Sequence, residues 1–132
     1  MATLKSRHIS ISINADPAEV YKFAGDPQNL PKWVAGLSRS EMTKSGDSWI
    51  ADSPMGKVKV KFVAANTFGT LDHDVTLPSG VVVHNPLRVL KNGSGSEVVF
   101  TLFRQLDMTD EQFEKDAEMV LRDLRALKKQ CE

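Results

Sequence analysis

Two of the chain's three histidines, His73 and His84, lie in the segment GTLDHDVTLPSGVVVHNP, residues 69–86, on either side of a Pro-Ser-Gly turn. Imidazole changes its charge near neutral pH, so a histidine pair could transfer protons or bind a metal ion. Whether the two rings meet depends on the sheet that carries them, because successive residues of a strand point to opposite faces.

The same alternation argues against a metal site around His73. Asp72 and Asp74 flank His73 in sequence but face the other side of a strand, and the spacing of His73 and His84 fits no familiar ligand motif. The glycine-rich NGSGS, residues 92–96, joins two predicted strands and does not open a helix, so a hairpin turn explains it. We therefore expect no metal and no cofactor.

Composition narrows the class of partner. The 132 residues carry 17 Lys plus Arg and 17 Asp plus Glu, which gives zero net charge and no basic patch for nucleic acid. No run approaches the roughly 20 apolar residues of a membrane span. Cys131 is the only cysteine, which fits a reducing cytoplasm, and the length fits a single domain over residues 1–132.

The first third of the chain predicts one strand followed by two short helices. Residues 7–13, RHISISI, alternate strictly and indicate a half-buried strand. Asp16 and Pro17 then begin a short helix that ends at Gly25, and a second Asp-Pro pair starts another short helix or turn over residues 26–37.

The middle of the chain reads as strands separated by turns. The predicted strands cover residues 38–44, 48–53, 57–64, 69–77, 81–90 and 96–105. Together with the first strand they make about seven. Their connections are too short for parallel crossovers, so we expect an antiparallel meander.

The last 25 residues change from a period of two to a period of 3.6. Thr109 and Gln112 form a capping box, and about 22 residues follow with one apolar stripe. Such a helix must cover an apolar surface, and one face of the sheet is the surface available.

Two stretches carry a resemblance to a known superfamily. INADPAEVYKFAGDPQNLPKWVAGL, residues 13–37, and GSEVVFTL, residues 95–102, resemble the START-like (SRPBCC) superfamily in its polyketide cyclase and dehydratase-like branch. The resemblance implies an α+β helix-grip fold: a seven-stranded curved antiparallel sheet wrapped around the C-terminal helix, with two short helices between strands 1 and 2. It also implies a cavity between sheet and helix that takes a hydrophobic small molecule.

The family pattern in the last strand decides which residues face that cavity. If Phe100 and Arg104 face inward, pairing Val89 with Val98 turns Asn85 inward, and a three-residue loop pairing Leu77 with Val81 turns His73 inward. His84 then faces outward, so the two histidines do not meet. A two-residue loop or a bulge at Asn85-Pro86 would reverse this assignment.

The predicted site gathers polar and aromatic side chains in an apolar cavity. His73 is the candidate acid or base, and Arg104 or Asn85 could stabilise an oxyanion. A single inward histidine in a half-buried sheet is more often a core residue hydrogen-bonded to a neighbour such as Asn85. Arg104, near a strand end, could instead have a rim or salt-bridge role. The expected ligand-binding residues are Trp33, Trp49, His73, Asn85, Phe100, Arg104, Phe113 and Val120.

Three functions remain open from the sequence. The first is binding of a hydrophobic, ring-containing small molecule. The second is a cyclase or dehydratase reaction that uses His73. The third is a protein-interaction module with a vestigial cavity, and an outward apolar strip of Val82, Val99 and Phe103 suggests a homodimer.

Overall fold

The computed structural model describes residues 2–132 and begins with the predicted strand and short helices. Strand β1 leads into helix α1, whose N-cap Asp16 accepts the Ala18 N–H, and Asp26 caps the next turn by accepting the Gln28 N–H. The elements are β1 (Ser6–Ile13), α1 (Pro17–Gly25), η1 (Pro27–Asn29), α2 (Leu30–Trp33) and η2 (Ala35–Leu37).

The strands of the middle region are all antiparallel and form two sheets. One sheet has the order β1-β8-β7 and the other the order β2-β3-β4-β5-β6. Their bounds are β2 (Thr43–Ser45), β3 (Ser48–Ser53), β4 (Gly56–Phe62), β5 (His73–Thr76), β6 (Val82–Asn85), β7 (Leu87–Asn92) and β8 (Gly95–Phe103).

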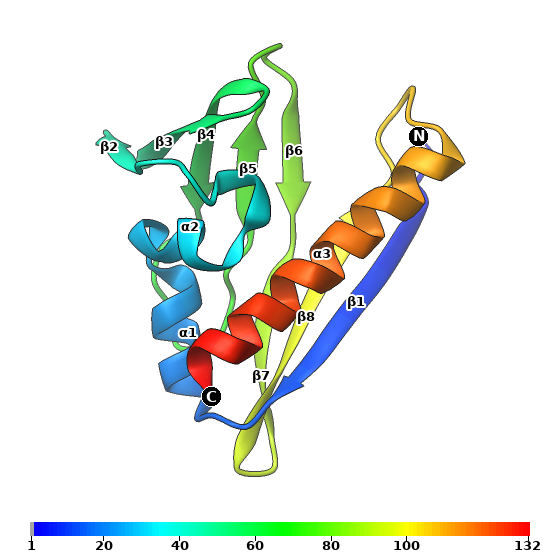
Figure 1. The fold of residues 1–132 in the computed structure, drawn as a ribbon. Helices are drawn as coiled ribbons and strands as arrows, with labels where there is room; N and C mark the ends of the chain where they lie inside the picture. The colour runs from blue at the N-terminus through cyan, green and yellow to red at the C-terminus, as the bar shows by residue number, and fades with distance from the viewer. Residues whose placement is uncertain (1) are drawn as a thin grey trace.

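Helix α3 (Asp110–Cys131) confirms the predicted long C-terminal helix and its Thr109–Gln112 capping box. Figure 1 shows α3 running diagonally in front of β8 and β1, with α1 and α2 beside its C-terminal half. This is the curved sheet and long helix of a helix-grip arrangement. No helix within residues 2–132 is long and apolar enough to span a bilayer.

The expected single seven-stranded sheet is replaced by eight strands in two sheets, because the predicted strand 81–90 breaks at Pro86. Proline has no N–H, so it cannot donate a ladder hydrogen bond to β8. Its carbonyl still accepts the Thr101 N–H. Beyond this point β7 continues on β8 while β6 pairs only with β5, so the two sheets part between β6 and β8.

Side chains replace the ladder bonds lost at this break. Leu71 N–H still donates to the Leu87 carbonyl, but the Leu87 N–H donates to Asp72 Oδ1. The Leu71 carbonyl in turn accepts from His73 Nδ1. The register does not slip across the break, since Thr70 faces Arg88 before it and His73 faces Asn85 after it.

The buried core falls into two clusters along α3. The larger contains Leu124 and Leu127 near the C-terminal end of the helix, and the smaller contains Leu102, Phe113 and Ala117 near its N-terminal end. Phe100 and Val120 are only partly buried and pack against both clusters. The region between the clusters is therefore incompletely filled.

Gly69 lies where the chain passes very close to β7, just before the two sheets separate. Its φ is 74°, and a Cβ there would collide with the Val89 carbonyl oxygen. Gly46, in the β2–β3 turn, has a φ of 63° but open space around its Cβ. We expect Gly46→Ala to lower the free energy of unfolding by about 1 kcal/mol.

Gly69→Ala should cost at least about 2 kcal/mol more than Gly46→Ala, because a backbone collision adds to the same strain. Urea denaturation of the two variants measures the difference. Equal losses would show that the segment around Gly69 can move away from β7.

Candidate functional site

A cavity of about 160 Å³ lies between the β4–β6 strands, the α2–η2 segment and α3. Its walls are mostly apolar, and its polar side chains come from different elements. The lining residues are Leu30, Trp33, Val34, Leu37, Val60, His73, Val75, Asn85, Phe100, Val120, Asp123 and Leu124. Five of the eight side chains expected in the site, Trp33, His73, Asn85, Phe100 and Val120, thus lie together.

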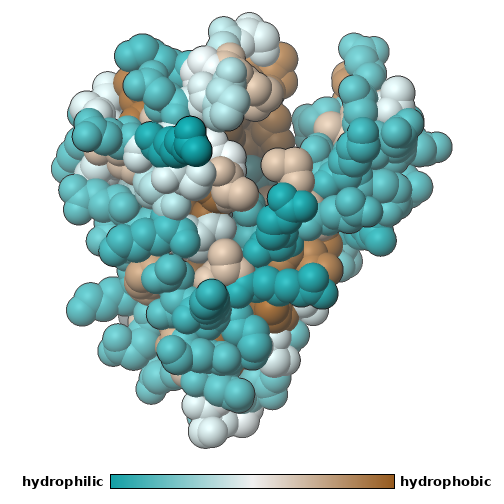
Figure 2. All heavy atoms as spheres, in the orientation of Figure 1, coloured by the Kyte–Doolittle hydropathy of each residue, from teal (hydrophilic) through white to brown (hydrophobic). Residues whose placement is uncertain are grey.

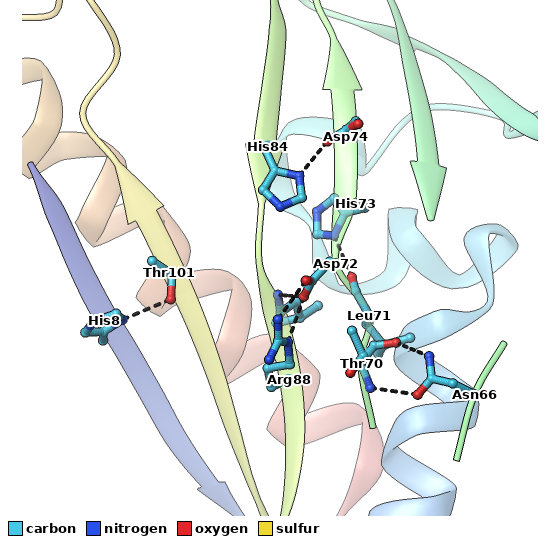
Figure 3. Close-up of polar contacts among 11 residues, drawn as sticks. His8, Asn66, Thr70, Leu71, Asp72, His73, Asp74, His84, Arg88 and Thr101 are labelled. Carbon is cyan, nitrogen blue, oxygen red and sulfur yellow. Dashed lines mark hydrogen bonds and ion pairs between the residues drawn. The ribbon is translucent and has the colours of Figure 1, made fainter. Parts of the chain in front are cut away.

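His73 is held in one tautomer. Its Nδ1 lies 2.9 Å from the Leu71 carbonyl oxygen, and a carbonyl can only accept, so Nδ1 carries the proton (Figure 3). The other ring nitrogen, Nε2, then has a free lone pair. The ring is also fixed by Phe62, with centroids 4.9 Å apart, and by the edge of Phe100 at 6.4 Å.

Burial keeps the His73 imidazole neutral. Loss of solvent around the ring lowers the pKa of His73 below its usual 6.5, and the Leu71 carbonyl and the nearby carboxylates Asp72 and Asp74 oppose this only in part. The surface that the ring keeps belongs to the cavity wall. His73 is therefore a hydrogen-bond acceptor, and a possible base, at neutral pH.

The neighbours of His73 in sequence lie on the opposite face of the sheet. His84 bonds Asp74 at 2.6 Å, and Asp72 forms a two-point ion pair with Arg88 at 2.9 and 2.8 Å (Figure 3). His84 is exposed, so the prediction that the two histidines do not meet is confirmed.

Asn85 stands directly opposite His73 on β6, as the register predicted. Its side chain forms no hydrogen bond with residues 2–132. His73 is hydrogen-bonded to a neighbour, as the core-residue alternative expected, but the neighbour is Leu71 and not Asn85. The amide of Asn85 is therefore free to donate to, or accept from, a bound molecule.

Trp33 also brings an unused polar group to the cavity wall. Its side chain is 6% exposed, and its indole Nε1–H has no acceptor among the described residues. An indole N–H usually finds a partner when it is buried. The Trp33 N–H is therefore a donor that residues 2–132 leave unsatisfied, buried within the wall and not exposed to the cavity.

Asp123 is a lining residue that sequence reasoning missed. It accepts the Ala35 N–H through Oδ1 at 3.1 Å and so ties α3 to η2. Burial raises the pKa of Asp123 to about 6, against the weaker opposing effects of that hydrogen bond and of Arg122. The sequence offered one signal for this residue, a carboxylate next to Leu124 on the apolar stripe of α3. It could not reveal the partner of Asp123, because Ala35 lies 88 residues away in sequence.

The remaining three expected site residues lie outside the cavity lining. Arg104 donates to the Met108 carbonyl at 2.9 Å and to Asp110 at 2.6 Å, so it fixes the loop before α3. Phe113 is buried in the smaller core cluster. Trp49 lies opposite Val60 but does not itself line the cavity.

A larger and more open hollow of about 550 Å³ lies between α1, the loop before β5 and β7. Two of its polar side chains already bond within the protein: the Tyr21 hydroxyl accepts the Asn66 N–H, and the Asn66 side chain bridges to Thr70. Among the described lining residues, Lys91 is the one that is charged. None of the expected site residues lines it. The smaller cavity is the better candidate site.

The family comparison covers nearly the whole chain. The model of one family, described as polyketide cyclase / dehydrase and lipid transport, matches residues 6–132. No curated protein is detectably similar in sequence.

Solved structures of the same fold are similar over nearly their full length. XoxI from Bacillus cereus is 18% identical with a TM-score of 0.76, covering 97% of this chain and 96% of that one. The Aha1 dimer from Colwellia psychrerythraea is 16% identical with a TM-score of 0.75, covering 98% and 97%.

A third similar structure is longer than this chain. DynU16, a protein in the dynemicin biosynthetic locus, is 12% identical with a TM-score of 0.72, covering 94% of this chain and 46% of its own. At these identities the structures establish the fold alone.

His73 offers a direct test of the site's electrostatics. We expect its ring to stay in the Nδ1–H form at pH 7 and to take a proton only below pH 6.5, as followed by ¹H–¹⁵N NMR of the imidazole against pH. His8→Asn and His84→Asn variants assign the other two rings.

The lowered pKa of His73 also makes the folded protein more stable above pH 6.5 than below it. Because its folded pKa is depressed, the unfolded chain takes up the proton first, and the contribution is lost as pH falls through the folded pKa. An Nε2–H tautomer, or a midpoint above 6.5, would contradict the assigned geometry.

Proposed function

The chain belongs to the polyketide cyclase / dehydrase and lipid transport family, and we propose that it binds a hydrophobic molecule of about one ring in the cavity between β4–β6 and α3. The observation that carries the proposal is the cavity itself. A dry apolar cavity of about 150 Å³ holds a benzene molecule. The 160 Å³ found here therefore suits a single ring.

The polar groups of the wall support a ligand that is not a pure hydrocarbon. His73 and Asn85 both line the cavity, and no described residue uses the Nε2 lone pair of His73 or the amide of Asn85. A ligand whose own polar groups match these two can hydrogen-bond to them, and such bonds fix the orientation of a molecule in a mostly apolar pocket.

The cavity also weighs against the interaction-module alternative. That alternative expects side chains to fill the core completely, as in ordinary close-packed interiors. Phe100 and Val120 are instead left partly exposed to the space between the two core clusters.

An enzymatic role is the second candidate, and the fixed tautomer of His73 favours it. A neutral imidazole with a free Nε2 and an anchored Nδ1–H is the form that a general base needs. Asn85, opposite His73, could donate to a developing oxyanion. Arg104 supplies no such donor here, because Met108 and Asp110 engage it.

Self-association is a further part of the proposal. Val82 is 55% exposed on the outer face of the sheet, near the edge that also bears His84. An apolar position of this kind suits a contact with a second copy, and the similar Aha1 structure is a dimer. The lone Cys131 fits a reducing compartment such as the cytoplasm.

Filling the cavity with a larger side chain should weaken the binding of a one-ring ligand. We expect toluene to shift the NMR signals of Val75 and Val120 methyl groups in the unmodified chain, and Val120→Phe to weaken this binding at least roughly tenfold, because the added ring occupies the space. Met119→Phe is the matched control, since Met119 is exposed on the same helix.

Binding that survives Val120→Phe, or shifts confined to the outer hollow beside Phe68, would place the ligand elsewhere. Equal weakening by Met119→Phe would point to a general effect on α3. Thermal unfolding of both variants shows whether they fold.

The enzymatic candidate has a separate test. Acetophenone carries one ring and an enolisable methyl group, and an active His73 should accelerate exchange of that methyl group's protons in deuterated buffer. His73→Gln should remove at least roughly a hundredfold of this rate while leaving acetophenone binding within a factor of a few. Equal exchange rates in both proteins would rule out His73 as the base.

A further inference from the structure

Asp123 is the one carboxylate among the residues that line the inner cavity. Its Oδ1 is used by the Ala35 N–H, while Oδ2 accepts no hydrogen bond from residues 2–132. Asp123 also forms no ion pair within the described part of the chain. A partly buried carboxylate without a counter-ion is costly, which makes it a receptor for a cation.

None of the charged groups that the structure describes around Asp123 already serves as its counter-ion in the cavity. Lys32 on α2 and Arg122 on α3 line a shallow hollow on the outer side of Asp123, but neither lines the inner cavity. His73 on β5 lines the same cavity, and since burial lowers its pKa, it is a neutral acceptor there and not a competing cation. The η2 segment adds no charge, since it contributes the Ala35 N–H and the apolar side chain of Leu37.

An open cleft of about 400 Å³ lies next along the same elements, toward the N-terminal end of α3. The same elements line both spaces: Val75 then Leu77 on β5 and its turn, Asn85 then Val83 on β6, and Val120 then Asp116 on α3. Figure 2 shows this face hollowed between the main body and the lobe that holds the start of α3, with brown apolar atoms in the wall.

The cleft is acidic as well as apolar. Asp107 and Asp116 line it, and none of its lining residues is Lys or Arg. Arg104 lies close by, on the Met108 carbonyl, but Asp110 neutralises it. Partial burial raises the pKa of Asp116 in the same direction as that of Asp123. A cation entering through the cleft therefore meets one sign of charge along its path.

We infer that the ligand is a protonated amine on a single ring, with the ring in the apolar cavity and the ammonium group on Asp123. The inference rests on the proposed function, since it uses the same cavity. His73 Nε2 and the Asn85 carbonyl oxygen can accept the remaining ammonium protons, because both are free. Charge-assisted hydrogen bonds of this kind are the strong ones in a partly desolvated site.

Three probes of nearly equal size separate charge from shape. Benzylamine is cationic, benzyl alcohol neutral and benzoate anionic at pH 7.5, and NMR titration gives each dissociation constant. We expect benzylamine to bind at least roughly tenfold more tightly than benzyl alcohol, and benzoate to bind most weakly.

The variant Asp123→Asn isolates the charge. Its amide oxygen can still accept the Ala35 N–H, so η2 stays attached to α3. The preference for benzylamine over benzyl alcohol should disappear while benzyl alcohol binds as before. Glu118→Gln is the control, because it removes the same charge from an exposed position on α3.

The pH dependence has a definite sign. Asp123 is ionised above its pKa of about 6, so benzylamine affinity should rise through pH 6 and fall toward pH 5, although benzylamine stays protonated throughout. His73 takes up its proton below its usual pKa of 6.5, and a protonated His73 would repel the ammonium group. Both titrations therefore lower benzylamine affinity as the pH falls. The rise through pH 6 should be absent in Asp123→Asn.

The outcomes separate the amine inference from the proposed function. Equal binding of benzylamine and benzyl alcohol, or a preference that survives Asp123→Asn, overturns the amine inference and leaves the proposed function standing. Tightest binding of benzoate also overturns it. No binding of any of the three probes overturns both.

Discussion

The missing N–H of Pro86 is the constraint on which the rest of the structure depends. It ends the ladder between β6 and β8, so one potential sheet becomes two that diverge over α3. Asp72 and His73 supply the hydrogen bonds lost on the β5 side of the break, which lets the strands part without leaving buried backbone groups unpaired. The cavity lies in the space so opened.

The same break defines the chemistry of the site. Because the Leu87 N–H donates to Asp72 and not to the Leu71 carbonyl, that carbonyl accepts Nδ1–H from His73, which also lines the cavity. The hydrogen bond that satisfies the Leu71 carbonyl is therefore also the one that fixes the tautomer of His73. The outward side of the strand is occupied separately by the Asp72–Arg88 and Asp74–His84 pairs, which leave no second imidazole for the site.

The family and the geometry limit function in different ways. Membership in the polyketide cyclase / dehydrase and lipid transport family allows both binding and catalysis on one scaffold. The geometry adds the size of a single ring, a neutral histidine and a carboxylate without a counter-ion. A small, polar-tipped ring fits these features better than a long lipid chain does, because the inner cavity holds only about 160 Å³.

Local patterns in the sequence determined the α3 capping box, the strand alternation and the pairings of Val89 with Val98 and Leu77 with Val81, because these depend on neighbours a few residues apart. They therefore also determined that His73 and His84 point apart. Only the tertiary structure decided that Asp123 joins the site and that Arg104 does not. Asp123 meets Ala35, 88 residues away in sequence, through the packing of α3 on η2. Arg104 is engaged by Met108 and Asp110 because of how the loop before α3 folds, which strand and helix periodicity does not show.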